Sequence, residues 1–385
     1  MNSFSFHTTP SIRFGAGTIT ELGRIVTDRG WHRITLVTDK GIVQAGLIEQ
    51  PLALLHQAGV EVTLFDEVTA DPPEPVVYRA ATLAAEAQAQ AVVGLGGGSS
   101  LDVAKLVALL LGTSQDLRSA YGVGNAKGPR LPLLLIPTTA GTGAEVTPIA
   151  IITTGLHEKM GVVSPVILPD IALLDPELTL GLPAPVTAAT GIDAMVHAIE
   201  AYTSVSANNN PISRGLARQA LQLLGSNIHR AVHEGRDLEA RSAMLLGSML
   251  AGQAFTNSPV AAVHALAYPL GGHYGVPHGL SNALVLPHVL RFNMEACADS
   301  YAELAPLVFP DIGPGEGREG AVRFIEALAT LSHSVGLVQR LRDVGIEQDA
   351  IPMLAAEALK QQRLLVNNPV PVELADAAAI YRAAW

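Results

Sequence analysis

Residues 91–105 read AVVGLGGGSSLDVAK, an apolar run joined to a helical segment through a glycine-rich turn. The run at 91–95 predicts a buried strand, and the segment from about Ser100 to Leu111 predicts a helix. Glycine lets a backbone approach a ligand closely, and the free N–H groups at a helix start carry partial positive charge. The turn is therefore a candidate phosphate site, although a tight turn without a ligand would use the same residues.

Strands and helices alternate on both sides of this stretch. Strands are predicted at 34–39, 60–65 and 131–137, and helical segments at about 43–58 and 75–88. This alternation predicts a doubly wound sheet of parallel strands with right-handed crossovers. The glycine-rich turn follows the run at 91–95, which is the third predicted strand in chain order, whereas the standard Rossmann turn follows the first strand.

The pattern changes beyond Asp175, where Ala- and Leu-rich helical segments continue to the C-terminus. The segment 180–185 holds one glycine and two prolines and is a plausible hinge. We therefore predict an α/β domain at 1–182 and an all-helical domain at 183–385. Ligands of open α/β sheets bind at the carboxyl ends of the strands, so we expect the active site in the cleft between the two domains.

Composition limits the class of protein. The chain has 385 residues, of which 49% are apolar and 15% charged, with a formal net charge of −11. An acidic protein is a poor partner for nucleic acid or an anionic membrane. The single cysteine, Cys297, excludes an intrachain disulfide and a Cys-rich zinc site. The N-terminus lacks the features of a signal peptide and no apolar run reaches the roughly twenty residues of a membrane span, so we expect a cytoplasmic enzyme.

Two further features favour a dinucleotide ligand. Asp39 ends the first predicted strand, where a carboxylate accepts hydrogen bonds from a ribose 2′-hydroxyl and repels a 2′-phosphate. This position favours NAD over NADP, although an acidic residue after a strand is common in turns. The loop PTTAGTGAEVTP (137–148) adds hydroxyl and backbone donors after a buried strand, but a tight polar bend would explain it equally well.

Four residues form a candidate metal site. Asp193 and His197 are four residues apart on a predicted helix, so that both side chains lie on one face. His264 and His278 are fourteen residues apart with PLGG (269–272) between them, so we expect the chain to turn back there and present both imidazoles to one point. One carboxylate and three histidines suit a first-row divalent ion with open positions for a substrate oxygen. His273, between these two histidines, is a further candidate to line the site.

Several long motifs together resemble the iron-containing (group III) alcohol dehydrogenase family. They are GGGSSLDVAK, PTTAGTGAEVTP, DPELT, ATGIDAMVHAIEAYTS and HALAYPLGGHYGVPHGLSNALVLPHVLRFN, and the resemblance runs from FGAG near the N-terminus to NNP at 367–369. The resemblance implies a Rossmann-like domain, an all-helical domain, bound NAD(P), and a homodimer or larger assembly. It places the metal ligands on the same four residues. It implies cofactor contacts at Asp39, Gly97, Gly98, Ser99, Asp102, Thr138, Thr139, Thr142 and Lys159.

Two positions depart from the family pattern. Many members carry a histidine four residues after the third metal ligand, thought to relay protons near the nicotinamide, and this chain has Tyr268 there. Tyrosine has an ordinary pKa near 10 and is a poorer relay near neutrality, so either Tyr268 or His273 is the candidate relay. The second departure is Asp71, which stands where members usually have an asparagine that contacts the cofactor.

The sequence thus predicts a metal-dependent oxidoreductase that transfers a hydride between a primary or secondary alcohol and NAD. We expect Fe(II) as the metal, with zinc as the alternative, and a small alcohol or carbonyl compound as the substrate. A maleylacetate reductase or a polyol dehydrogenase of the same superfamily is the nearest alternative. A dehydroquinate synthase type of lyase and a non-catalytic nucleotide-binding protein are alternatives of other classes.

Overall fold

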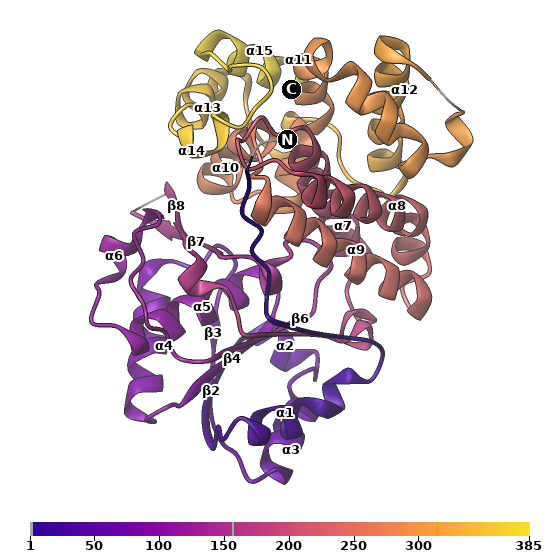
Figure 1. Cartoon of the computed structure of the whole chain (residues 1–385). Coiled ribbons are helices and arrows are strands. Elements are labelled where there is room, and N and C mark those ends of the chain that lie inside the picture. The colour runs from indigo at the N-terminus through magenta and orange to yellow at the C-terminus, as the bar shows by residue number, and fades with distance from the viewer. Residues whose placement is uncertain (1–2, 156–157, 314) are drawn as a thin grey trace. The chain divides into compact units, whose positions relative to one another are not determined.

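The computed structural model describes residues 3–155, 158–313 and 315–385, and these divide into two compact units (Figure 1). The α/β unit comprises 7–139 and 143–181. The helical unit comprises 182–385, together with the short segment 140–142 and an N-terminal segment that ends at Phe6. An N-terminal parallel α/β sheet followed by a largely helical part is the fold class that the sequence predicts, and this prediction is confirmed.

The α/β unit is built on a six-stranded parallel sheet. In spatial order the strands are β1 (Ser11–Phe14), β9 (Ile171–Leu174), β6 (Leu133–Pro137), β4 (Ala91–Gly96), β2 (Arg33–Asp39) and β3 (Glu61–Val68). The chain runs outward from β2 to β3 and then returns to β4 on the other side of β2. The sheet therefore has a topological switch point between β2 and β4, where parallel sheets bind ligands.

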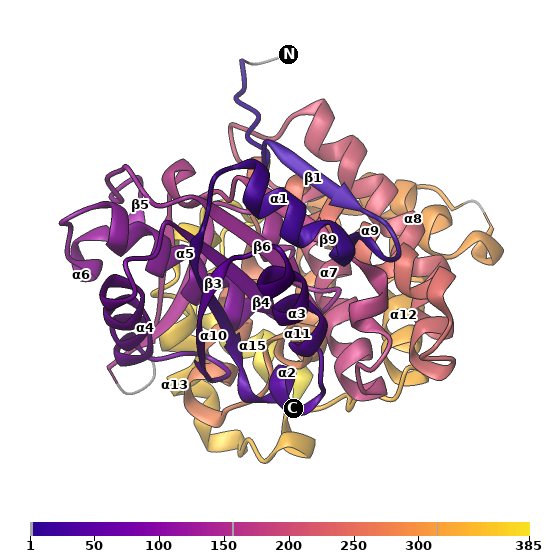
Figure 2. The same cartoon turned by 90° about the horizontal axis from the view of Figure 1, so that it is seen from below.

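Helices cover both faces of this sheet (Figure 2). Alternate residues of a strand point to opposite faces, so Ile34, Val93 and Leu134 join one core and Val37, Val92 and Leu133 join the other. The first core packs under α1 (Leu22–Asp28) and α3 (Glu49–Gln57), and the second under α4 (Glu74–Glu86) and α5 (Gly98–Gly112). Burial on both faces explains why these strands read as continuous apolar runs.

Smaller elements complete the α/β unit. A second sheet contains β5 (Gly122–Val123), β8 (Glu158–Val163) and β7 (Ile149–Thr154), with β7 and β8 antiparallel. The short helices are α2 (Lys40–Gln44), α6 (Leu117–Ala120), η1 (Thr18–Glu21), η2 (Ala144–Val146), η3 (Pro165–Ile167) and η4 (Pro176–Thr179).

The helical unit packs around a central helix, α7 (Ala184–Thr203), which is buried from Thr187 to Tyr202 except at Thr190. The other helices are α8 (Pro211–His233), α9 (Leu238–Asn257), α10 (Ala262–Tyr274), α11 (His278–Val308), α12 (Gly317–Ser334), α13 (Ile351–Ala358), α14 (Gln362–Leu365) and α15 (Leu374–Ala384), with short turns η5 (Pro310–Ile312), η6 (Leu341–Val344) and η7 (Gln348–Ala350). In the part of the chain that the structure describes, no helix combines the length and the apolarity that a bilayer crossing requires.

Two local predictions differ from the structure. The single helical segment expected at about 43–58 is wrong, because α2 ends at Gln44 and α3 begins only at Glu49. Gly46, which lies between α2 and α3, has a φ of +73° in the left-handed region, and this backbone conformation interrupts the helix. The sequence also missed β1, β9 and the β7–β8 pair, and β9, although fully buried, has only four residues. β1 has only four residues, two of them exposed, and so lacks the apolar pattern that identifies a buried strand.

Candidate metal and dinucleotide sites

Helix α7 supplies three polar side chains that lie on one face in an otherwise apolar environment. Asp193 is 2% exposed, and His197 and Glu200 follow at one-turn intervals, each 4% exposed. Burial of three such groups would be costly unless they were paired or bound an ion. This face of α7 is the base of a candidate metal site.

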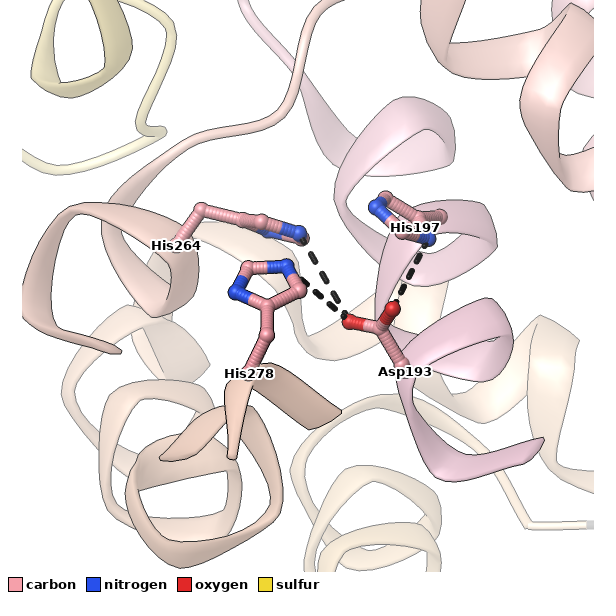
Figure 3. A group of neighbouring side chains, drawn as sticks. All are labelled: Asp193, His197, His264 and His278. Carbon is pink, nitrogen blue, oxygen red and sulfur yellow. Dashed lines mark ion pairs between the residues drawn. The ribbon is translucent and has the colours of Figure 1, made fainter. Parts of the chain in front are cut away.

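The two remaining histidines come from the neighbouring helices α10 and α11. His264 lies in the first turn of α10, and His278 is the first residue of α11. One potential ligand atom from each of Asp193, His197, His264 and His278 lies within 4.8 Å of the others (Figure 3). The Asp193 carboxylate oxygens lie 4.0 Å from His197 Nδ1, 4.0 Å from His264 Nε2 and 3.5 Å from His278 Nε2.

A glycine next to His278 allows α11 to approach α7. A Cβ atom at Gly279 would overlap the carbonyl oxygen of Ala189, one turn before Asp193. Only glycine permits this contact, which brings the start of α11 against α7. Gly279 therefore places His278 beside the Asp193 carboxylate for a steric reason that the sequence pattern does not reveal.

Glu200 orients one of these histidines. Its Oε2 lies 2.6 Å from His264 Nδ1, and its Oε1 accepts a hydrogen bond of 2.7 Å from the Val263 backbone N–H. The carboxylate fixes the proton of His264 on Nδ1 and leaves the lone pair of Nε2 directed toward the quartet. The sequence analysis did not select Glu200, although its spacing of seven residues from Asp193 on one helix face could have identified it.

Asn282 is a second residue that the sequence analysis did not select. It lies one turn after His278 on α11 and is fully buried. Its Nδ2 donates a hydrogen bond of 2.6 Å to Asp193 and lies 3.3 Å from Nε2 of both His264 and His278. The amide thus ties the carboxylate on α7 to the histidine at the start of α11.

The electrostatics of the quartet fit a divalent cation. Burial lowers the pKa of His197 to about 3, so its imidazole is neutral near pH 7, the form that ligates metals. Burial alone would raise the pKa of Asp193, but the neighbouring histidines and Asn282 hold it below its ordinary value. The Nδ1 atom of His197 is buried without a hydrogen bond. A carboxylate, neutral imidazoles and this unsatisfied nitrogen together suit a first-row metal ion.

One side of the quartet is more open than the rest. The side chain of His278 is 36% exposed, whereas those of Asp193, His197 and His264 are 2–5% exposed. The Phe255 ring stacks on His197 at 4.4 Å between centroids and closes that side. A small molecule would therefore approach the quartet from the side of His278.

The two candidate proton-relay residues occupy different parts of α10. Tyr268 lies one turn after His264, and its ring centroid is 6.1 Å from that of His278. His273 lies nine residues after His264, which on a regular helix corresponds to the opposite face. Tyr268 is therefore the residue of the two that shares the open side of the quartet.

The glycine-rich turn of the α/β unit has the features of a phosphate site. It connects β4 to α5, a helix of 15 residues that begins at Gly98. The residue before it, Gly97, has no side chain to cap the helix, so the first N–H groups are left for a ligand. A Cβ at Gly94 would lie 2.7 Å from Leu135 and 2.8 Å from Ala104, so this glycine is required for α5 to pack closely on the sheet.

The other predicted cofactor residues are distributed along the carboxyl edge of the sheet. Asp39 ends β2, Gly97, Gly98 and Ser99 follow β4, and Thr138 and Thr139 follow β6, with the Thr138 N–H bonded to the Gly96 carbonyl at 3.0 Å. Thr142 lies in the segment 140–142, which is part of the helical unit.

One of the predicted cofactor residues, Asp102, contacts the second sheet, and another, Lys159, lies on it. Asp102 accepts a hydrogen bond of 2.9 Å from the Ile151 backbone N–H, and Lys105, fully buried, donates to the Ile149 carbonyl at 2.6 Å. Lys159 on β8 pairs with Asp71 at 2.5 Å. The unusual Asp71 is therefore an ion-pair partner of a predicted cofactor residue, a relationship that sequence spacing does not indicate.

Comparison with known proteins identifies relatives along the whole chain. The family model described as "Iron-containing alcohol dehydrogenase" matches residues 9–176, and that described as "Fe-containing alcohol dehydrogenase family, C-terminal" matches residues 187–385. Long-chain-alcohol dehydrogenase 1 of Geobacillus thermodenitrificans is 39% identical over 379 residues, which cover 98% of this chain and 95% of the relative.

Two other similar proteins extend this comparison. The NAD-dependent methanol dehydrogenase of Bacillus methanolicus is 33% identical, with 98% of this chain and 99% of the relative covered. The crystal structure of a 1,3-propanediol oxidoreductase superposes with a TM-score of 0.96 at 36% identity and covers both chains completely. Sequence and structure are therefore similar along the full length of the chain.

Proposed function

This chain belongs to the iron-containing alcohol dehydrogenase family, and we propose that it transfers a hydride reversibly between a primary or secondary alcohol and the nicotinamide of NAD. The matches to both family models favour this reaction over the lyase and the non-catalytic alternatives. We assign NAD binding to residues 1–182, and metal and substrate binding to residues 183–385.

The observation that carries the proposal is the buried quartet. Asp193, His197, His264 and His278 converge within 4.8 Å, and His278 alone of the four has a substantially exposed side chain. A divalent ion bound by these residues would act as a Lewis acid on an alcohol oxygen and lower its pKa. Iron(II) is the metal that we propose, with zinc as the alternative, because imidazole and carboxylate ligands serve both.

The α/β unit supports NAD as the cofactor. The uncapped start of α5 suits a pyrophosphate, and the Asp39 carboxylate at the switch point suits unphosphorylated ribose. The Bacillus methanolicus relative is described by name as NAD-dependent. We propose contacts to NAD from the residues that the family resemblance selects.

The remaining roles belong to residues of the helical unit. Glu200 and Asn282 hold the ligands in orientation, and Tyr268, beside His278, would accept or donate the hydroxyl proton. Methanol and 1,3-propanediol, the alcohols named for two of the similar proteins, both carry a primary hydroxyl. We therefore propose a primary alcohol as the first substrate to test, and a homodimer or larger assembly as the active form.

The experiment combines metal analysis with a substrate panel. Purified protein is assayed for iron and zinc by elemental analysis, and for NAD reduction with short alcohols, long-chain alcohols, diols and secondary alcohols. We expect close to one metal ion per chain, NAD reduction with at least one primary alcohol, and loss of activity after chelation that iron(II) or zinc restores. Protein that is fully active without metal, or that reduces NAD with none of these alcohols, would contradict the proposal.

A further inference from the structure

The topological switch point of the sheet contains a contact between side chains from two different strand ends. Strands β2 and β4 are adjacent and parallel, with Val37 paired to Gly94. Asp39 ends β2, and Ser100 lies in the first turn of α5, just after β4. Ser100 is buried, with 1% of the residue exposed, and its hydroxyl donates a hydrogen bond of 3.0 Å to Asp39 Oδ2.

Both oxygens of the Asp39 carboxylate accept hydrogen bonds from the protein. Oδ1 accepts a hydrogen bond of 3.1 Å from the backbone N–H of Ile42, as a cap of α2, and Oδ2 accepts the Ser100 hydroxyl. Each carboxylate oxygen has two lone pairs, so each keeps one acceptor position. Asp39 is half-buried, which leaves these positions accessible to hydroxyl groups of a ligand.

Gly96 allows this contact to form. Its φ of +146° lies in a region that L side chains rarely adopt, and a Cβ there would lie 2.8 Å from Ser100 Oγ and 3.3 Å from Asp39 Oδ2. The glycine-rich turn therefore does more than leave room for a phosphate, because it also leaves room for the hydrogen bond that orients Asp39.

We propose that Ser100 is a specificity-determining positioning residue, which holds the Asp39 carboxylate toward the ribose hydroxyls and thereby excludes NADP. This inference rests on the proposed function, because it concerns the dinucleotide of that reaction. A carboxylate held at both oxygens cannot turn away from a 2′-phosphate, so like-charge repulsion is maintained. If the Ser100 bond is lost, the carboxylate turns toward solvent, and the exposed Lys40, the next residue, is left to attract the phosphate.

The test measures dinucleotide binding by the full-length protein, with dissociation constants for NADH and NADPH obtained by fluorescence titration. For Ser100→Ala we expect the preference for NADH over NADPH to fall about fivefold or more, since hydrogen bonds to charged groups contribute more than neutral ones. Ser100→Cys fills the space with a slightly larger group that is only a weak donor, so it should reduce the preference as Ser100→Ala does. It also controls for damage caused by the cavity in the alanine variant.

A double-mutant cycle separates positioning from a general structural effect. In an Asp39→Asn background, Ser100→Ala should leave the NADH to NADPH ratio unchanged, because the residue acts through the Asp39 charge. An unchanged ratio in the single variants, or an equal change in the Asp39→Asn background, would overturn the inference while leaving the proposed function intact. A wild-type protein that binds neither dinucleotide would overturn both.

Discussion

The two candidate sites of this protein are constructed in different ways. The metal quartet of the helical unit is made of side chains alone, which come from α7, α10 and α11 and are oriented by further buried side chains such as Glu200 and Asn282. The dinucleotide site of the α/β unit relies on backbone N–H groups at the start of α5 and on glycines that leave space.

This difference determines how each site should respond to substitution. A site of side chains loses a ligand or its orientation with every change, whereas a site of backbone groups keeps most of its donors. Polar side chains near the glycine-rich turn mainly contact one another or the backbone, as in Asp39 with Ser100 and Asp102 with Ile151. We therefore expect large losses from changes in the quartet and shifts in selectivity from changes in the turn.

The largest effect is expected for His278→Ala. Loss of one of four ligands should remove the metal and reduce turnover by about a thousandfold or more, because the remaining groups do not replace Lewis-acid activation. The circular dichroism spectrum and NADH affinity should change little, since the α/β unit is untouched. His229→Ala, a change of an exposed histidine on α8, is the matched control and should keep both metal and activity. A metal-free His278→Ala protein with full activity would contradict the proposed mechanism.

A smaller loss is expected for Glu200→Gln. The amide no longer provides the charge that stabilises the His264 Nδ1 proton, so metal affinity should fall by about 10- to 100-fold. The measurement is a competition titration with a chelator, and the exposed Glu326→Gln on α12 is the control. Unchanged metal affinity would show that the ligand set does not depend on this orienting carboxylate.

Tyr268→Phe should affect turnover without affecting metal content. Removing the hydroxyl while keeping the ring should lower kcat about tenfold and alter the pH profile of kcat, because proton transfer then depends on water. His273→Ala should change kcat by less than about threefold, since His273 lies toward the other face of α10. The reverse order of effects would assign the relay to His273.

The smallest functional effect is expected for Glu145→Gln in η2 of the α/β unit. Burial raises the pKa of Glu145 from 4.5 to about 7, so the folded state holds the proton between these values while the unfolded state releases it. The stabilising contribution is thus complete below pH 4.5 and is lost as the pH rises through about 7. The melting temperature of the variant should equal that of the wild type at pH 4.5 and should be a few degrees higher at pH 8.5. Each kcal/mol of stability corresponds to roughly 2–4 °C in melting temperature. Equal melting shifts at both pH values would contradict this assignment.

The sequence predicted most of the main elements of the α/β unit. Strands β2, β4 and β6 and helices α4 and α5 were identified because apolar runs and helical periodicity report burial directly. The short edge strand β1 and the β7–β8 pair were missed, since half-exposed strands carry little of that pattern, and the buried β9 was missed because four residues are too few to show it. Gly46 broke a predicted helix because a helical composition does not exclude one left-handed residue.

The sequence by itself determined the chemistry of the metal site. A one-turn spacing predicted that Asp193 and His197 share one helix face, and their short separation predicted that His264 and His278 can approach each other. The chain turns between these two histidines at Gly275, after the end of α10, whereas PLGG (269–272) lies within that helix. These two relationships are local and follow from spacing along the chain, whereas the meeting of the two pairs depends on the packing of α11 against α7 at Gly279.

Only the tertiary structure decided how those groups are held. Glu200 meets His264 across 64 residues, Asn282 meets Asp193 across 89, and Ser100 meets Asp39 across 61. Such contacts depend on how helices pack and on which strands are neighbours, and no spacing in one sequence encodes them. The residue types of the sites were therefore readable from the sequence, while the partners that orient them emerged only when the chain was folded.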